Sequence, residues 1–140
     1  MKYNGVEVFG IMASLNAANS TKGQGRQFIR TNKKRFEKAY TEIIGWSGDF
    51  EDEFDELEVQ RSQSGDVVGF TFNFEKGTDG VKAFNEYLRG AEFDVEPYLM
   101  TEEVMAFVDG VDLNQEQALM SLTLEFAKAK AEAEAEAEEE

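Results

Sequence analysis

The chain has 140 residues, 41% of them hydrophobic, and its 14 Lys or Arg against 29 Asp or Glu give a formal net charge of −15. It contains no Cys and no His, which excludes disulfides, thiolate nucleophiles, His-ligated metals and catalysis by Ser-His-Asp or Cys-His sets. The length fits one globular domain, and neither an apolar run of about 18 residues nor an export signal is visible, so we expect a cytoplasmic protein without a membrane span.

Charge is distributed unevenly along the sequence. Residues 22–38 carry seven basic side chains and one acid, whereas residues 39–124 carry four basic and 20 acidic side chains. An acidic surface of this strength repels nucleic-acid phosphate and anionic lipid, and it attracts basic partners. We therefore expect no contact with membranes and expect the acidic region to face a basic partner.

The N-terminal residues predict a strand followed by a loop. Residues 6–8 begin a short alternation of apolar and polar side chains, which favours a strand leading into irregular structure. Val8, Met12 and Leu15 also lie at helical spacing, so a helix is the alternative. Residues 16–25 are rich in Asn, Ser, Thr and Gly and predict a loop.

A long amphipathic helix is predicted next. Apolar side chains from Ile29 to Ile44 recur at spacings of seven, four and three residues, which traces one helical face. Basic side chains occupy the other faces. Gly45 is expected to end this helix, because glycine favours the position just after a helical run.

The middle of the chain predicts a β-hairpin. Residues 49–58 are rich in acids, with apolar side chains at a spacing that favours one or two helical turns. From Leu57 the pattern changes to alternation, residues 62–66 predict a turn, and residues 67–75 alternate again, so the two runs form a hairpin. The apolar face of the second strand consists of Val68, Phe70, Phe72 and Phe74.

A further helix and an extended link follow the hairpin. Residues 78–90 combine a capping Thr78 with apolar side chains at helical spacing, and Gly90 lies at the expected end. Residues 91–100 include the single proline, Pro97, and predict a short edge strand or an extended link.

The remaining sequence predicts two helices, the second of which continues into a charged tail. Residues 101–108 form a short helix capped by Thr101. Asp112 and Gln115 are in capping-box register at the start of the last helix. The narrow apolar stripe of that helix consists of Leu119, Leu122 and Phe126.

These elements predict an α+β fold with a small antiparallel sheet around the hairpin at about residues 57–75, packed by helices. We expect one globular domain over residues 1–126. Residues 127–140 form an Ala/Glu-rich acidic tail that is either helical or disordered, since Ala and Glu favour helix but clustered acids oppose the dipole at its end. The predicted core includes Phe36, Ile43, Phe70, Phe72, Phe74, Phe84 and Leu88.

Two acidic clusters are the first candidate site. Seven acids within ten residues exceed what solubility requires, and their spacing is compatible with imitation of nucleic-acid phosphates; the alternative is a solvated surface that only keeps the chain soluble. The same carboxylates have the chemistry to hold Mg²⁺ or Ca²⁺, but no metal site is predicted from their spacing. The acidic residues expected to contact a partner are Asp49, Glu51, Asp52, Glu53, Asp55, Glu56, Glu58, Glu92, Asp94 and Glu96.

The basic helix is the second candidate site. Its cations are suited to phosphate, and aromatic residues nearby are suited to stacking on single-stranded bases. The alternative is that these cations pair with the chain's own acidic surface. The residues expected to contact nucleic acid are Lys22, Arg26, Arg30, Lys33, Lys34, Arg35, Lys38 and Trp46.

The function favoured by the sequence is a small, non-enzymatic binding protein that acts through its acidic surface on a protein partner and needs no cofactor. In size, charge and lack of Cys and His the chain resembles phage accessory proteins, which include inhibitors of host enzymes, DNA mimics and assembly chaperones. The alternative is a single-stranded nucleic-acid-binding protein whose tail, from Glu132 to Glu140, recruits partners. An enzyme would have to use carboxylates with Mg²⁺.

Overall fold

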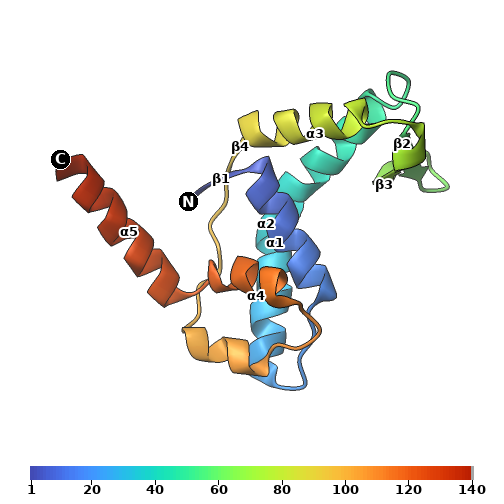
Figure 1. The fold of residues 1–140 in the computed structure, drawn as a ribbon. Helices are drawn as coiled ribbons and strands as arrows, with labels where there is room; N and C mark the ends of the chain where they lie inside the picture. The colour runs from blue at the N-terminus through green and yellow to red at the C-terminus, as the bar shows by residue number, and fades with distance from the viewer. Residues whose placement is uncertain (140) are drawn as a thin grey trace. The chain divides into compact units, whose positions relative to one another are not determined.

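The computed structural model describes residues 1–139, and the side chains of residues 1–137 (Figure 1). Helices account for 61% of the chain and strands for 15%, in two small antiparallel sheets, so the predicted α+β class is confirmed. None of the described helices combines the length and apolar character needed to cross a bilayer. The elements are β1 (Lys2–Asn4), α1 (Gly5–Ala17), α2 (Gly23–Asp49), β2 (Leu57–Arg61), β3 (Val67–Phe72), the 3-10 turn η1 (Phe74–Lys76), α3 (Asp79–Gly90), β4 (Glu92–Asp94), the 3-10 helix η2 (Glu102–Phe107), α4 (Leu113–Met120) and α5 (Leu124–Glu139).

The contacts divide the chain into two compact units. The first unit contains Met1, residues 10–36 and the chain from Val95 onward, and the second contains residues 2–9 and 37–94. Helices α1 and α2 therefore each contribute residues to both units. Residues 127–139 of the predicted tail belong to α5, which continues as one helix toward the C-terminus, and Glu140 lies outside the described residues (Figure 1).

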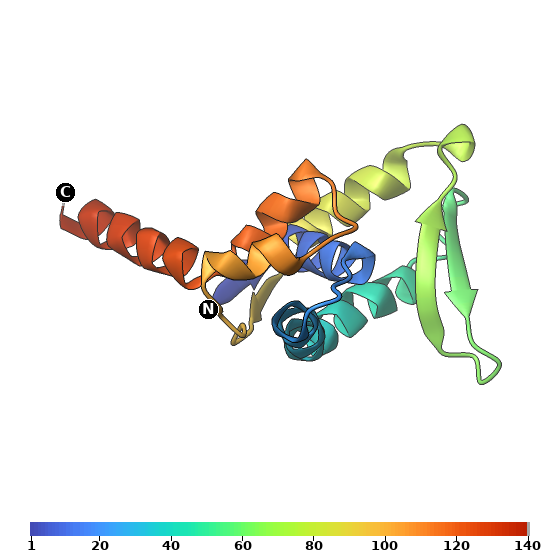
Figure 2. The same cartoon turned by 90° about the horizontal axis from the view of Figure 1, so that it is seen from below.

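The second unit is built on two antiparallel strand pairs. Strand β1 pairs with β4, and β2 pairs with β3 to form the predicted hairpin (Figure 2). Leu57 lies opposite Phe72 in this hairpin. Phe70 packs at 4.7 Å from Phe84 of α3 and at 6.1 Å from Phe9 of α1, measured between ring centroids. Helices therefore cover the aromatic face of the hairpin.

Phe70 and Phe72 of the predicted hairpin face are only half-buried, and its other two residues are exposed. The pairing shifts between Gln60 and Arg61, so Val68 is an extra residue on β3, and its side chain is 60% exposed. Phe74, predicted as core, is 66% exposed because β3 ends at Phe72 and the chain turns into η1. Asn73 fixes this turn, since its side chain accepts a hydrogen bond of 3.1 Å from the Glu75 amide.

The N-terminal prediction of a strand followed by irregular structure was wrong beyond Asn4. The side chain of Asn4 accepts a hydrogen bond from the Glu7 amide, and the Glu7 carboxylate accepts one from the Asn4 amide, both at 2.9 Å. This reciprocal cap begins α1 at Gly5. Val8 and Leu15 are buried, so the helical spacing was the correct pattern.

Helix α2 does not end at Gly45 as predicted, but continues to Asp49. A glycine inside a helix costs only about 1 kcal/mol, and tertiary packing outweighs it. Ile43, Ile44 and Ser47 are buried on either side of the glycine, which holds the additional turn in place. The expected loop is correspondingly short, because α1 extends to Ala17 and α2 begins at Gly23.

The first unit has a core of large side chains that are completely buried, including Leu15, Phe28, Phe36, Leu119 and Leu122. A buried amide, Asn32 of α2, attaches the link after β4 to this core. Its side chain donates hydrogen bonds of 3.0 Å to the carbonyls of Phe28 and Tyr98, and accepts one of 2.9 Å from the Tyr98 amide. Asn32 therefore pairs with both backbone polar groups of Tyr98 in the link.

The predicted last helix is two helices. The capping box is confirmed. The backbone amide of Gln115 donates to the Asp112 side chain at 2.8 Å, and the Gln115 side chain accepts from the backbone amide of Asp112 at 3.0 Å. Helix α4 nevertheless ends at Met120, and the amide of Leu124 at the start of α5 bonds to the Met100 carbonyl at 2.9 Å. The apolar stripe is interrupted as a result: Leu119 and Leu122 are buried, whereas Phe126 is exposed.

Candidate functional site

The acidic cluster of the second unit lies on the last residue of α2 and the loop that follows, residues 49–55, which we call the acidic loop. The one or two helical turns predicted here do not form; the chain passes from α2 to β2 through turns. Phe54 is half-buried, and its Cβ lies 3.1 Å from the position that a Cβ on Gly80 would occupy. The acidic loop therefore packs against the start of α3.

Glu56 anchors the acidic loop. Its side chain, predicted to contact a partner, is instead buried, with only 5% exposed. Its carboxylate accepts a hydrogen bond from the amide of Gly80 in the first turn of α3, and its backbone carbonyl accepts one of 2.8 Å from Asn73. Thr78 occupies the N-cap position but its side chain makes no capping bond, so Glu56 supplies the cap from elsewhere in the chain.

Three other predicted acids are partly neutralised by ion pairs. Glu51 pairs with Arg61, Glu58 lies 4.0 Å from Lys76, and Glu92 lies 2.7 Å from Lys2. These pairs are largely exposed, so each contributes little to stability. Glu92 also raises the pKa of Lys2, first through their hydrogen bond and then through its charge.

The remaining predicted acids are exposed. Four belong to the acidic loop and form no ion pair within the described part of the chain: Asp49, Asp52, Glu53 and Asp55. Asp94 is exposed on β4 in the second unit, and Glu96 is exposed in the first unit. The second unit as a whole carries six basic and 16 acidic side chains, a net charge of −10. Its negative field is therefore centred on groups that are open to solvent.

An exposed aromatic side chain accompanies the acidic loop. Phe74 begins η1, and the amide of Gly77 bonds to its carbonyl at 3.3 Å. A Cβ on Gly77 would lie 3.7 Å from the Glu56 carboxylate, so η1 and the anchor of the acidic loop adjoin. The sequence did not identify Phe74 as a surface residue, because its alternation with Phe70 and Phe72 continues past the end of the strand.

The first unit carries a separate surface of positive charge. Lys22, Arg26, Arg30 and Lys34 are each four residues apart, and Lys33 lies beside them. Lys22 lies just before α2, and at about 100° per residue the other four cations fall within an arc of about 100° on the helix, over a length of about 12 Å. We call this row the cationic stripe. Arg35 lies on the opposite side and donates a hydrogen bond of 3.2 Å to the Glu96 carbonyl.

The cationic stripe is not neutralised by acids of the chain. Across residues 1–137 none of its five cations has a carboxylate within ion-pair distance. Arg26 makes one hydrogen bond of 2.8 Å, to the Thr21 carbonyl. The predicted alternative, in which these cations pair with the chain's own acids, is therefore not what the described residues show.

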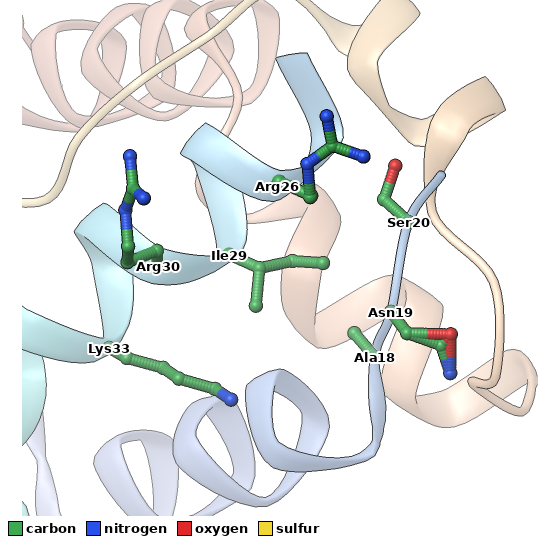
Figure 3. A pocket seen from close by; sticks show the side chains of 7 residues that line it. All are labelled: Ala18, Asn19, Ser20, Arg26, Ile29, Arg30 and Lys33. Atoms are coloured by element: carbon green, nitrogen blue, oxygen red, sulfur yellow. The ribbon is translucent and has the colours of Figure 1, made fainter. Parts of the chain in front are cut away.

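A hollow of about 380 Å³ lies beside the stripe. One wall is α2, which contributes Arg26, Ile29, Arg30 and Lys33, and the other is the chain between α1 and α2, with Ala18, Asn19 and Ser20 (Figure 3). Sequence reasoning named the three cations but not the other four residues. The spacing of 26, 30 and 33, by four and then three residues, was the available signal that these cations share one face.

The aromatic residues expected near the basic helix do not lie on this surface. Phe28 and Phe36 are completely buried in the first unit. Trp46 belongs to the second unit, where its ring stacks on Tyr87 at 4.9 Å and lies 4.6 Å from Phe50. Burial, followed by the charges of Glu42 and Asp49, raises the pKa of Tyr87. Lys38 is exposed and also belongs to the second unit.

Within the described residues no three acidic side chains converge in a group that is suited to a metal ion. The comparisons with known proteins give no family: no family model, no curated protein and no solved structure matches the chain. The two charged surfaces, the acidic loop with Phe74 and the cationic stripe with its hollow, are therefore the basis for assigning a function.

Proposed function

We propose that this chain is a small, non-enzymatic binding protein that docks a basic protein partner through the acidic loop and Phe74 of its second unit. The observation that carries the proposal is the combination of four exposed, unpaired carboxylates with an exposed aromatic ring on neighbouring segments. Aromatic residues provide much of the binding energy at protein interfaces, whereas surrounding charges guide the encounter and set specificity. The accessory roles of an inhibitor, a DNA mimic or an assembly chaperone all use such a surface.

The anchoring of the acidic loop supports this proposal. Glu56 fixes the acidic loop to the start of α3, so the carboxylates of the loop are held close together. A surface that is organised before binding loses less conformational entropy when a partner docks. Basic groups on the partner then meet several carboxylates at once.

The experiment captures partners from a bacterial lysate on the immobilised chain at about 50 mM and about 300 mM salt. The same capture is repeated with the triple variant Asp52→Asn, Glu53→Gln, Asp55→Asn. A matched control is Glu132→Gln, Glu134→Gln, Glu136→Gln, which removes the same charge from α5. We expect a basic partner that is retained by the control, lost with the loop variant and weakened at high salt.

Recovery of nothing that is salt-sensitive would contradict the proposal, as would equal loss with both triple variants. A competition arm separates the accessory roles. Added DNA displaces the chain from the partner if the acidic loop imitates DNA, and leaves the complex intact if the chain acts as a chaperone or binds elsewhere on the partner.

A second candidate function is favoured by the cationic stripe: binding of single-stranded nucleic acid, with the acidic tail recruiting partners. Its five cations have no carboxylate partner within the described residues, which leaves them available for phosphate. The test is fluorescence anisotropy of a labelled oligonucleotide at low salt. Removal of residues 132–140 should tighten binding, and the absence of binding with and without the tail would eliminate this candidate.

A further inference from the structure

The hollow beside α2 has the dimensions of a small-molecule site. Its volume of about 380 Å³ lies within the range of protein ligand pockets, roughly 300–1,000 Å³. Ala18 and Ile29 supply buried apolar surface, whereas Arg26 and Arg30 are exposed and Lys33 is half-buried. The hollow therefore combines an apolar contact area with a concentrated positive charge.

The walls of the hollow are held by backbone contacts. Asn19 and Asp109 exchange two hydrogen bonds, of 2.9 and 2.8 Å, which fix the chain between α1 and α2. Gly25 allows this chain to approach α2, since a Cβ there would meet the Phe107 carbonyl at 2.9 Å and collide with Ser20. The shape of the hollow thus exists before any ligand binds.

The cations around the hollow are suited to an anion with several oxygens. The hydrogen bond from Arg26 to the Thr21 carbonyl orients its guanidinium and leaves other N–H groups free. Arg30 and Lys33 have no ion-pair partner among the described residues, and in Figure 3 the guanidinium groups of Arg26 and Arg30 reach to one side of Ile29 while the Lys33 ammonium group reaches to the other. A single carboxylate is saturated by one arginine fork, whereas the three terminal oxygens of a phosphate can accept from both arginines.

We infer that this hollow binds a small organic phosphate, such as a mononucleotide. The phosphate is held by Arg26 and Arg30, and the organic part rests on Ile29 and Ala18. This site lies in the first unit, so it is independent of the acidic loop. It shares three cations with the second candidate function but requires a different ligand, because a polyanion needs the whole stripe and a mononucleotide needs only the hollow.

The test is isothermal titration calorimetry of the full chain with AMP, inorganic phosphate and adenosine. We expect AMP to bind at least tenfold more tightly than inorganic phosphate, and adenosine to give no heat. Arg30→Ala should weaken the affinity for AMP at least tenfold, because hydrogen bonds to charged groups are stronger than those between neutral groups. Arg35→Ala, on the opposite side of α2, is the matched control and should bind AMP normally.

Equal affinity for AMP and inorganic phosphate would overturn the inference, as would unchanged AMP binding by Arg30→Ala. The double variant Lys22→Ala, Lys34→Ala separates it from the second candidate function. This variant removes stripe cations that do not line the hollow, so it should weaken the binding of a labelled oligonucleotide and leave the binding of AMP unchanged. Oligonucleotide binding without AMP binding would eliminate the hollow as a ligand site and leave the second candidate intact.

Discussion

Replacement of Glu56 by Ala tests how the acidic loop is held. The substitution removes the carboxylate that accepts the Gly80 amide, and Gly80 is itself buried. An unpaired buried amide costs about 1–3 kcal/mol, and loss of a helix cap costs about 0.5–2 kcal/mol. Both figures describe the same hydrogen bond, so we expect a loss of about 2 kcal/mol in the free energy of unfolding. Glu56→Gln keeps an acceptor but loses the charge near the helix dipole, so its loss should be about 0.3–1 kcal/mol.

The assay is urea denaturation followed by the fluorescence of Trp46, which is the single tryptophan and lies in the second unit. With a slope of about 1–3 kcal/mol per M urea, the midpoint for Glu56→Ala should fall by about 1 M. The matched control is Thr78→Ala, because Thr78 occupies the N-cap without making a capping bond. A control that loses as much stability as Glu56→Ala would refute the assignment of the cap to Glu56.

Three further predictions concern other parts of the chain. Asn32→Ala should lower the free energy of unfolding by about 2–3 kcal/mol, since it leaves the part-buried backbone amide and carbonyl of Tyr98 without this partner; a loss under about 0.5 kcal/mol in urea denaturation would contradict this. Phe74→Ala should leave stability within about 0.5 kcal/mol while abolishing partner capture, whereas Phe84→Ala should cost about 3–5 kcal/mol because that ring is buried. Tyr87 has a raised pKa, so the folded chain favours the neutral phenol and should lose stability as the pH rises from about 10. The wild-type stability curve should therefore fall more steeply than that of Tyr87→Phe above this pH, and parallel curves would count against it.

The elements with strong local signals were predicted well from the sequence. The alternation on either side of residues 62–66 specified the hairpin, and the capping box of Asp112 and Gln115 formed as expected. Prediction from the local sequence pattern failed where one segment carried two patterns at once. Residues 6–15 carry both an alternation and helical spacing, and the reciprocal cap between Asn4 and Glu7 decided for the helix.

Tertiary contacts account for the other differences. Nothing near Glu56 in the sequence indicates that this acid is buried, because its hydrogen-bonding partner is Gly80. Ile43, Ile44 and Ser47 are buried around Gly45, which keeps α2 helical past a residue that usually ends helices. The alternation of apolar residues likewise could not show where β3 stops.

The candidate site was identified only in part. The sequence predicted the acidic side chains of residues 49–58 and the basic side chains, but it included Glu56 in the first surface and Trp46 in the second. Both residues pack within the second unit, Glu56 at the start of α3 and Trp46 among aromatic rings. Phe74 and the apolar part of the hollow emerged only from the three-dimensional arrangement.

Hydrogen–deuterium exchange of the chain, measured with and without its captured partner, tests the central proposal most directly. Docking on the acidic loop predicts slower exchange of the amides in residues 49–55 and 73–77 when the partner is bound, with little change in α5. Protection confined to residues 18–34, with the acidic loop exchanging as fast as in the free chain, would contradict it.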